Sequence, residues 1–255
     1  MKKQNTFRHN NSGQLLIVAA LAIAILISST TTYVYELSRE TSNTNTSSLN
    51  DFVLAIKQST RNVVLSSLAN VSNGGVNTIL TENLNLFSHV VRDLYRLGIN
   101  NLQFTVRDDS NYNEGLRFSR GNSGVGVSSA SANFMLQVFA ETTNINLQYE
   151  INMTTVVTIN GSYIALDDNA KNVSLTCNVE NEGQPALAKS LVMFYNNAGN
   201  WTQVDTANNL SIIDHGDGTY TVSFTVAVED PVQVSVQVLD LRSIFVSANM
   251  TCSGA

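Results

Sequence analysis

The chain has few of the side chains that carry out most enzymatic chemistry. It contains 3 histidines and 2 cysteines, and charged residues make up only 13% of its composition. Catalysis by general acids, bases or nucleophiles needs polar groups with complementary protonation roles close together, and this composition leaves few such combinations. The sequence also lacks a His-Glu-x-x-His helix, a phosphate loop and a Gly-x-Ser-x-Gly elbow. We predict that the protein is not an enzyme and that it binds no cofactor.

Positive charge is scarce as well. The chain has 14 Lys and Arg against 20 Asp and Glu, which gives a formal net charge of −6. Three of the basic residues precede residue 10, whereas every acidic residue follows residue 35. An acidic chain without a basic stripe is a poor surface for nucleic acid or for anionic lipid headgroups. We therefore predict no nucleic-acid partner.

Two acidic loops have some of the oxygen ligands of a calcium site but not its pattern. In the loop around Asp108–Glu114, the sixth position lacks the required glycine and the twelfth is Arg120 instead of a bidentate Glu. The second loop, Asp214–Gly218, has the composition of a tight turn. His89 falls on the polar face of a predicted helix and His215 lies in a turn. We predict no metal site and interpret both loops as hydrated turns.

Charge is missing altogether from residues 10–35, which follow a leader containing Lys2, Lys3 and Arg8. About 20 helical residues span a hydrocarbon core of about 30 Å, so we expect a transmembrane helix over residues 14–36 with the lipid bilayer as its partner. Basic residues favour the cytoplasmic side, which places the leader 1–13 in the cytoplasm and later residues outside a cell membrane. Cleavage as an ordinary secretion signal is the alternative, although the small-x-small sites in Ala20–Ala24 lie inside the apolar run.

The two cysteines, Cys177 and Cys252, are far apart in the sequence. Zinc sites need more ligands and closely paired ones, so this spacing does not predict a metal. A disulfide closing a loop of about 75 residues would stabilise the fold by about 4 kcal/mol in the chain-entropy model. We expect a Cys177–Cys252 disulfide, with two unpaired buried thiols as the alternative.

Asparagine is abundant, and eight Asn-x-Ser/Thr sequons follow the uncharged stretch. Each motif needs three residues and so also arises by chance in such a chain. As a set in a part of the chain expected outside a membrane, they predict a glycosylated surface. The acceptor residues are Asn45, Asn70, Asn152, Asn160, Asn172, Asn200, Asn209 and Asn249.

Beyond the uncharged stretch, the sequence pattern divides the chain into three parts. Residues 37–48 include an apolar-free run of Ser, Thr and Asn and are predicted to be a linker. In residues 49–165, apolar residues recur near every 3.6 positions up to Gly98, which predicts two helices. They then alternate in several predicted strands, separated by a loop over Asp108–Gly126. This part is predicted to be a small extracellular α+β module.

The last part, residues 166–255, is predicted to be all-β. About seven short stretches alternate apolar and polar residues, and turn residues separate them. Short strands at this spacing are typical of a β-sandwich.

Two stretches of this last part resemble bacterial and archaeal immunoglobulin-like domains of surface proteins. Gly183–Ala186 followed by Val192–Phe194 is similar to the early part of those domains. Asp214–Phe224 resembles the turn and strand found late in them and in filamin-type repeats. The resemblance implies an immunoglobulin-like sandwich over residues 166–255 that serves spacing, adhesion or self-association.

The N-terminal segment Ser12–Ala20 resembles archaeal type IV pilin-like proteins. In that family, the prepilin peptidase would cut after Gly13 and leave Gln14 as the first residue of a hydrophobic helix that packs in a filament core. The segment departs from the family where Ser12 replaces the usual charged residue and where Val18 stands in place of a glutamate. An uncleaved signal anchor is the alternative to such processing.

These patterns together predict a fold class and a function. The predicted fold is an N-terminal transmembrane helix, a small α+β module and an all-β immunoglobulin-like sandwich. The predicted function is that of a non-enzymatic, membrane-anchored cell-surface protein, a pilin-like filament subunit or minor component that assembles with itself or with other pilin-like subunits. The alternative is a stand-alone receptor or adhesion module that binds a protein or glycan through the immunoglobulin-like domain.

Overall fold

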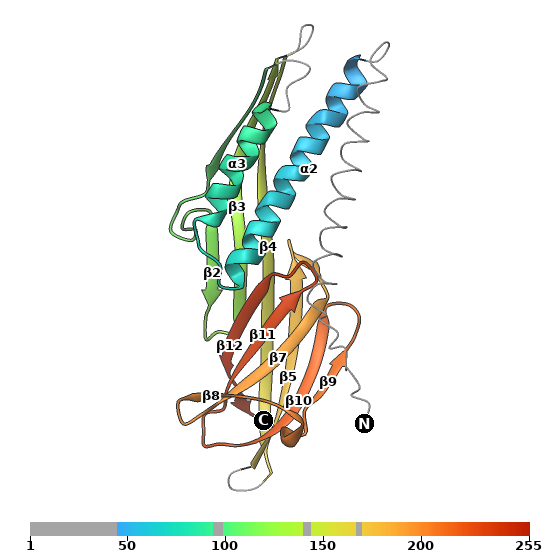
Figure 1. Ribbon diagram of the computed structural model, residues 1–255. Coiled ribbons are helices and arrows are strands. Elements are labelled where there is room, and N and C mark those ends of the chain that lie inside the picture. Colours follow the sequence, from blue (N-terminus) through green and yellow to red (C-terminus); the bar gives the residue numbers. More distant parts are fainter. Residues whose placement is uncertain (1–44, 94–98, 140–143, 167–169) are drawn as a thin grey trace, which may run out of the picture. The chain divides into compact units, whose positions relative to one another are not determined.

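The computed structural model describes residues 45–93, 99–139, 144–166 and 170–255 (Figure 1). The chain forms two compact units, Met1–Ile56 and Lys57–Ala255. Of the first unit, the described residues are 45–56, which form the beginning of a helix. The second unit contains the rest of that helix, a second helix and all the strands of the described residues.

The elements follow one another along the chain as two helices and then strands. The helices are α2 (Asn45–Ser72) and α3 (Ile79–Asp93), and a short 3-10 helix η1 spans Thr206–Asn208. The strands are β1 (Ile99–Val106), β2 (Leu116–Arg120), β3 (Val125–Phe139), β4 (Asn144–Ala165), β5 (Ala170–Asn181), β6 (Gln184–Pro185), β7 (Ala188–Asn197), β8 (Asn200–Gln203), β9 (Ser211–Asp214), β10 (Thr219–Ala227), β11 (Gln233–Asp240), β12 (Phe245–Thr251) and β13 (Ser253–Gly254).

Within the described residues, the strands form a nine-stranded sheet and a four-stranded sheet. The nine-stranded sheet has the order β1-β3-β4-β5-β10-β9, with β2 beside β3, β6 beside β5 and β13 beside β4. The four-stranded sheet has the order β12-β11-β7-β8. Neighbouring strands are antiparallel, except that β13 runs parallel to β4. The longest strand, β4, has 22 residues and lies in the middle of the larger sheet, between β3 and β5 (Figure 1).

The two sheets pack face to face over an apolar core. Successive side chains of a strand point to opposite faces, and alternate residues of β5, β10 and β11 are buried as a result. Phe224 is the largest fully buried side chain, and Leu175 and Met193 are 1% exposed. Burial of a side chain of this size stabilises the fold by about 1.5–3 kcal/mol.

Within the second unit, residues 57–72 of α2 and helix α3 cover one face of the larger sheet where it consists of β1, β3 and β4 (Figure 1). Leu68 of α2 and Leu80 and Leu84 of α3 are buried, and so is Phe134 on the covered face of β3. The ring of Phe134 stacks on the ring of Tyr149 at 5.3 Å, and the Tyr149 hydroxyl lies 3.1 Å from the hydroxyl of Thr60 on α2. The periodicity of the apolar residues thus predicted these two helices correctly.

The membrane part of the predicted fold class is corrected. In the described ranges from residue 45 onward, no helix is both long enough and apolar enough to cross a membrane. This finding contradicts the prediction of a single-pass protein in a cell membrane with a cytoplasmic N-terminus and extracellular domains. The leader 1–13, the segment 14–36 and linker residues 37–44 lie outside the described residues, whereas Asn45 already begins α2.

The prediction of an α+β module followed by a separate sandwich is also wrong. Strand β4 pairs with β3 along Asn144–Thr158 and with β5 along Thr155–Ala165, so one sheet runs through both predicted modules. The fold is sheet-dominated, with the helices on part of it. Within the predicted loop Asp108–Gly126, residues Leu116–Arg120 form β2 and pair with β3.

Candidate functional site

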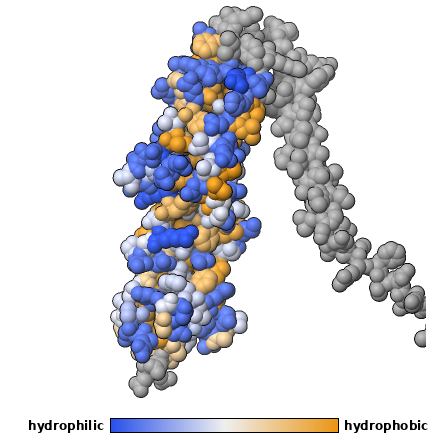
Figure 2. All heavy atoms as spheres, turned by 60° about the vertical axis from the view of Figure 1, so that its left-hand side comes forward, coloured by the Kyte–Doolittle hydropathy of each residue, from blue (hydrophilic) through white to orange (hydrophobic). Residues whose placement is uncertain are grey.

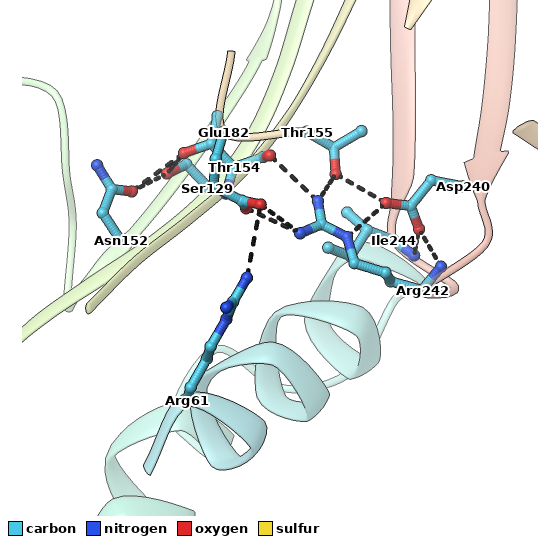
Figure 3. A network of polar contacts seen from close by, with 9 residues as sticks. All are labelled: Arg61, Ser129, Asn152, Thr154, Thr155, Glu182, Asp240, Arg242 and Ile244. Atoms are coloured by element: carbon cyan, nitrogen blue, oxygen red, sulfur yellow. Dashed lines mark hydrogen bonds and ion pairs between the residues drawn. The ribbon is translucent and has the colours of Figure 1, made fainter. Parts of the chain in front are cut away.

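A polar network fixes the two sheets against each other, and Arg242 lies at its centre (Figure 3). Its guanidinium donates to both carboxylate oxygens of Glu182 at 2.8 and 2.9 Å and to Oδ2 of Asp240 at 2.9 Å. It also donates to the carbonyl of Thr154 and to the hydroxyl of Thr155. The planar fork of arginine allows these contacts at once, which the single ammonium of a lysine would not. Arg61 of α2 approaches Glu182 at 3.9 Å.

Asp240 is the buried member of this network. Its side chain is 0% exposed, and it accepts from the backbone N–H groups of Arg242 and Ile244 at 2.8 Å each. The hydroxyl of Thr155 on β4 donates to its other oxygen. The carboxylate therefore closes the β11–β12 turn and ties it to the larger sheet. Each carboxylate oxygen of Asp240 accepts two hydrogen bonds. The carboxylate therefore stabilises the fold and has no free oxygen to offer a ligand.

A depression of about 570 Å³ opens at one end of the four-stranded sheet, between the β7–β8 hairpin and the loop joining β10 to β11. Small-molecule sites in proteins have volumes of about 300–1,000 Å³. The lining includes the amides of Asn196 and Gln233 and the carboxylates of Glu229 and Asp230. Gly199 in the hairpin donates its N–H to Oδ1 of Asn196, and Nδ2 of Asn196 donates to Oε1 of Gln233 at 2.8 Å. These bonds orient both amides.

Asp230 is held in place by two residues that do not line the depression. Its Oδ1 accepts from Nζ of Lys171 at 2.7 Å and from the hydroxyl of Tyr163 at 2.5 Å. The hydrogen bond from Lys171, and then that from Tyr163, lower the pKa of Asp230 below its ordinary value. The Lys171 side chain is 6% exposed and lies 5.1 Å from the centre of the Tyr163 ring, whereas that of Asp230 is 67% exposed. The depression thus has a fixed carboxylate on its rim.

Trp201 lies next to this depression. It is directly opposite Asn196 in the β7–β8 pairing, and Nδ2 of Asn196 donates to Oε1 of Gln233 on β11. Residues paired in this way share one face of a sheet, with Cβ atoms of neighbours about 4.5–5.5 Å apart. Trp201 is the single tryptophan of the chain, and it is 46% exposed. An exposed indole offers an apolar ring face and an N–H donor to a ligand.

The face that carries Trp201 is otherwise neutral. In the described pairing of β12, β11, β7 and β8, no Asp, Glu, Lys or Arg belongs to the residues that share the face of Trp201. Amides, hydroxyls and apolar groups alternate there. On the side of the molecule drawn in Figure 2, small hydrophobic patches likewise lie among hydrophilic ones. By register, the residues on this face are Ser190, Val192, Phe194, Asn196, Trp201, Gln203, Gln233, Ser235, Gln237, Leu239, Phe245, Ser247, Asn249 and Thr251. Of these, Ser235 and Ser247 are buried, and the guanidinium of Arg120 on β2 lies 6.0 Å from the centre of the Phe245 ring.

The predicted disulfide is not formed in the structure. Cys177 and Cys252 are both free and both buried, at 0% and 4% exposure. Burial raises the pKa of Cys177 to about 12 and that of Cys252 to about 11. A buried thiol with a raised pKa is unreactive, because the thiolate is the reactive form.

Three of the predicted sequons share one exposed surface. Asn152 and Asn160 of β4 and Asn172 of β5 are exposed and, by register, point out of the face of the larger sheet that lies away from the core. The amide oxygen of Asn152 accepts from the hydroxyls of Ser129 and Thr154. Their glycosylation stays a prediction.

The other five sequons are scattered. Asn70, Asn200 and Asn209 are exposed, and Asn45 begins α2. Asn249 has a buried amide oxygen without a hydrogen-bond partner. The predicted processing site at Gly13 and Gln14 lies outside the described residues.

The remaining candidates hold local structure. His89 contacts Arg92 on the exposed face of α3, and His215 bonds to Thr221 across a turn. Asp109 accepts from Arg107 and from two backbone N–H groups, which lowers its pKa. Among the described residues, no group of three or more His, Cys, Asp and Glu could hold a metal ion.

Sequence reasoning missed Arg242, Asp240, Lys171 and Asp230. The sequence does contain a signal for Lys171. This residue stands two residues before Val173 in a strand whose alternate residues are buried, so the alternation predicts a buried charge at this position. Asp240 has the same kind of signal: it ends β11 and falls on the same alternate positions as the buried Val234, Val236 and Val238. Arg242 lies in the turn after β11, where charged residues are common, and nothing in the local sequence separates it from a solvated turn residue.

Comparison with known proteins adds no further assignment. No family model matches the chain, and no curated protein matches it significantly.

Proposed function

We propose that the protein is a non-enzymatic structural subunit that assembles with copies of itself or with related subunits, in the manner of archaeal type IV pilin-like proteins. The observation that carries the proposal is the segment Ser12–Ala20, where Gly13-Gln14 is followed by the apolar run Leu15–Ile27. In pilin-like proteins, cleavage at such a site frees a hydrophobic helix for packing in a filament core.

The described unit supports a role without chemistry. Its acidic side chains with shifted pKa values hold structure: Asp109 closes a turn with Arg107, Asp217 accepts from Thr219, and Asp230 pairs with Lys171. Asp230 also lines the depression at the β7–β8 hairpin, and a catalytic role there would need a second reacting group beside it. A rigid sheet-dominated unit suits a subunit that has to keep its shape in an assembly.

A cleavage and sedimentation assay tests this proposal. Purified full-length protein is incubated with an archaeal prepilin peptidase, and the product is analysed by mass spectrometry and by ultracentrifugation. We expect a product that begins at Gln14 and sediments as filaments visible by electron microscopy. The matched control, Gly13→Val, should be neither cut nor assembled. Cleavage elsewhere, or a product cut at Gly13 that stays monomeric at every concentration, would contradict the proposal.

A second candidate function is adhesion through the end of the four-stranded sheet. The observation that favours it is the exposed Trp201 beside the depression lined by Asn196, Gln233 and Asp230. Exposed tryptophans are enriched at the centres of binding surfaces. Binding of a ligand at this position is compatible with assembly through another part of the chain.

A further inference from the structure

We propose that the depression at the β7–β8 hairpin, together with Trp201, is a binding site for a neutral saccharide. This inference goes beyond the role of filament subunit and depends neither on cleavage at Gly13 nor on assembly. Four features of the site carry it: its shape, an aromatic platform, fixed hydrogen-bonding groups and its charge.

The shape and the aromatic platform come from the β7–β8 hairpin. The depression of about 570 Å³ is open, and Asn196 and Gln233 form one of its walls. Trp201 is paired with the lining residue Asn196 across β7 and β8, which places the indole on the same face of the sheet as the Asn196 side chain. One face of a pyranose ring presents C–H groups, which pack against an aromatic ring, while the ring hydroxyls point to the sides. An indole beside a polar depression offers both kinds of contact.

The hydrogen-bonding groups of the depression are oriented in advance. Oε1 of Gln233 accepts from Asn196, which leaves the Nε2 group of this lining residue as a donor for a ligand oxygen. Oδ1 of Asp230 accepts from Lys171 and Tyr163, which leaves Oδ2 as an acceptor for a ligand hydroxyl. Sugar hydroxyls both donate and accept, so they match an amide and a carboxylate placed side by side. Groups held by the protein lose little freedom when a ligand binds.

The charge of the site selects a neutral ligand. Glu229 and Asp230 line the depression, and no Lys or Arg is among its lining residues, so phosphate, sulfate or uronic acid groups would be repelled. The nearest buried cation, Lys171, is already paired with Asp230 at 2.7 Å. The same pairing opposes a metal ion, because Lys171 would lie beside it. A neutral, hydroxyl-rich molecule is neither repelled by the two carboxylates nor opposed by the Lys171 ammonium.

The single tryptophan makes binding directly measurable. Full-length protein is titrated with neutral hexasaccharides (cellohexaose, mannohexaose and N-acetylchitohexaose) and with a hexamer of galacturonic acid as the acidic comparison. We expect at least one neutral hexasaccharide to change the fluorescence of Trp201 with saturation, and the acidic one to leave it unchanged. No response to any neutral hexasaccharide at millimolar concentration would overturn the proposal, and so would tighter binding of the acidic hexamer.

Variants then locate the site by calorimetry with the hexasaccharide that binds. Trp201→Ala should weaken binding about tenfold or more, and Gln233→Ala about fivefold. Phe118→Ala removes another exposed aromatic, on β2, and should bind as the wild type does. Far-UV circular dichroism confirms that each variant is folded. Unchanged affinity in Trp201→Ala and Gln233→Ala would overturn the proposal.

Two further results separate this inference from its alternatives. A glycoprotein that binds equally well after enzymatic removal of its glycans would assign the surface to protein recognition and overturn the saccharide site. Trp201→Ala should still be cleaved after Gly13 and should still sediment as filaments. Loss of saccharide binding with assembly intact supports the inference, whereas failure of assembly in the wild type contradicts only the proposed function.

Discussion

Removal of the Asp240 carboxylate is the perturbation whose cost can be derived most directly from the structure. Asp240→Ala leaves the backbone N–H groups of Arg242 and Ile244 without their acceptor, and both lie in the turn that joins β11 to β12. An unsatisfied buried donor costs about 1–3 kcal/mol, which gives about 2–6 kcal/mol for the two. Breaking a buried ion pair by removing one partner costs about 3–5 kcal/mol, in agreement with that range.

We therefore expect Asp240→Ala to lower the free energy of unfolding by about 3–5 kcal/mol, out of about 5–15 kcal/mol for a typical domain. Urea denaturation followed by far-UV circular dichroism measures the change, with equal m-values required for the comparison. The matched control is Asp93→Ala, because Asp93 is 76% exposed and pairs with Arg92 at 3.7 Å. The control should lie within about 0.5 kcal/mol of the wild type.

Two companion variants test the geometry of the same network. Arg242→Lys should recover little of the loss caused by Arg242→Ala, because one ammonium cannot bridge Asp240, Glu182 and the Thr154 carbonyl at once. A double-mutant cycle of Asp240→Ala and Arg242→Ala should show coupling of about 1 kcal/mol or more. The reasoning is refuted if Asp240→Ala costs less than about 1 kcal/mol or if the two residues contribute additively.

Three further predictions follow from burial and charge. With a pKa of about 12, about one Cys177 thiol in ten thousand is ionised at pH 8, so iodoacetamide should modify Cys177 and Cys252 only after unfolding, as peptide mass spectrometry would show. Because the folded pKa of Asp230 is lowered, its contribution to stability is present above about pH 4 and lost as pH falls through the folded pKa, so Asp230→Asn should flatten the acid limb of stability against pH. Gly126→Ala should lower the melting temperature by several degrees, because a Cβ there would overlap the carbonyl oxygen of Ser247 on β12. Equal melting temperatures for Gly126→Ala and the wild type would show that β12 can move away.

The local elements of this fold are largely readable in the sequence. The apolar stripe of α3 and the alternation in β5, β10 and β11 predict the right kind of element, because burial on one side imposes a period of 3.6 or 2. Both patterns depend only on neighbours in the chain. They identified helices and strands without specifying which strands lie side by side.

The arrangement of those helices and strands in the fold could not be predicted from the sequence. The sequence showed a boundary near residue 165, yet β4 continues to Ala165 and its pairing with β5 carries the sheet across it. At Gly161 a side chain would overlap Leu175 of β5, so this glycine marks close packing inside a strand and not the end of a module. Which strands pair with one another is determined by tertiary contacts, and a local sequence pattern does not contain this information.

The candidate saccharide site shows the same limit. Trp201, Asn196, Gln233 and Asp230 come from separate elements, and cross-strand pairing and the β10–β11 loop bring them together. In the sequence, Trp201 is one aromatic residue in a short polar stretch. Its exposure and its neighbours became visible only in the folded chain.

The mass of the N-terminal peptide of the protein isolated from its native cells shows whether the chain is processed as a pilin-like subunit. We expect a mature chain that begins at Gln14, recovered from material that sediments as filaments. A mature chain that still begins at Met1 would contradict the assignment as a pilin-like subunit.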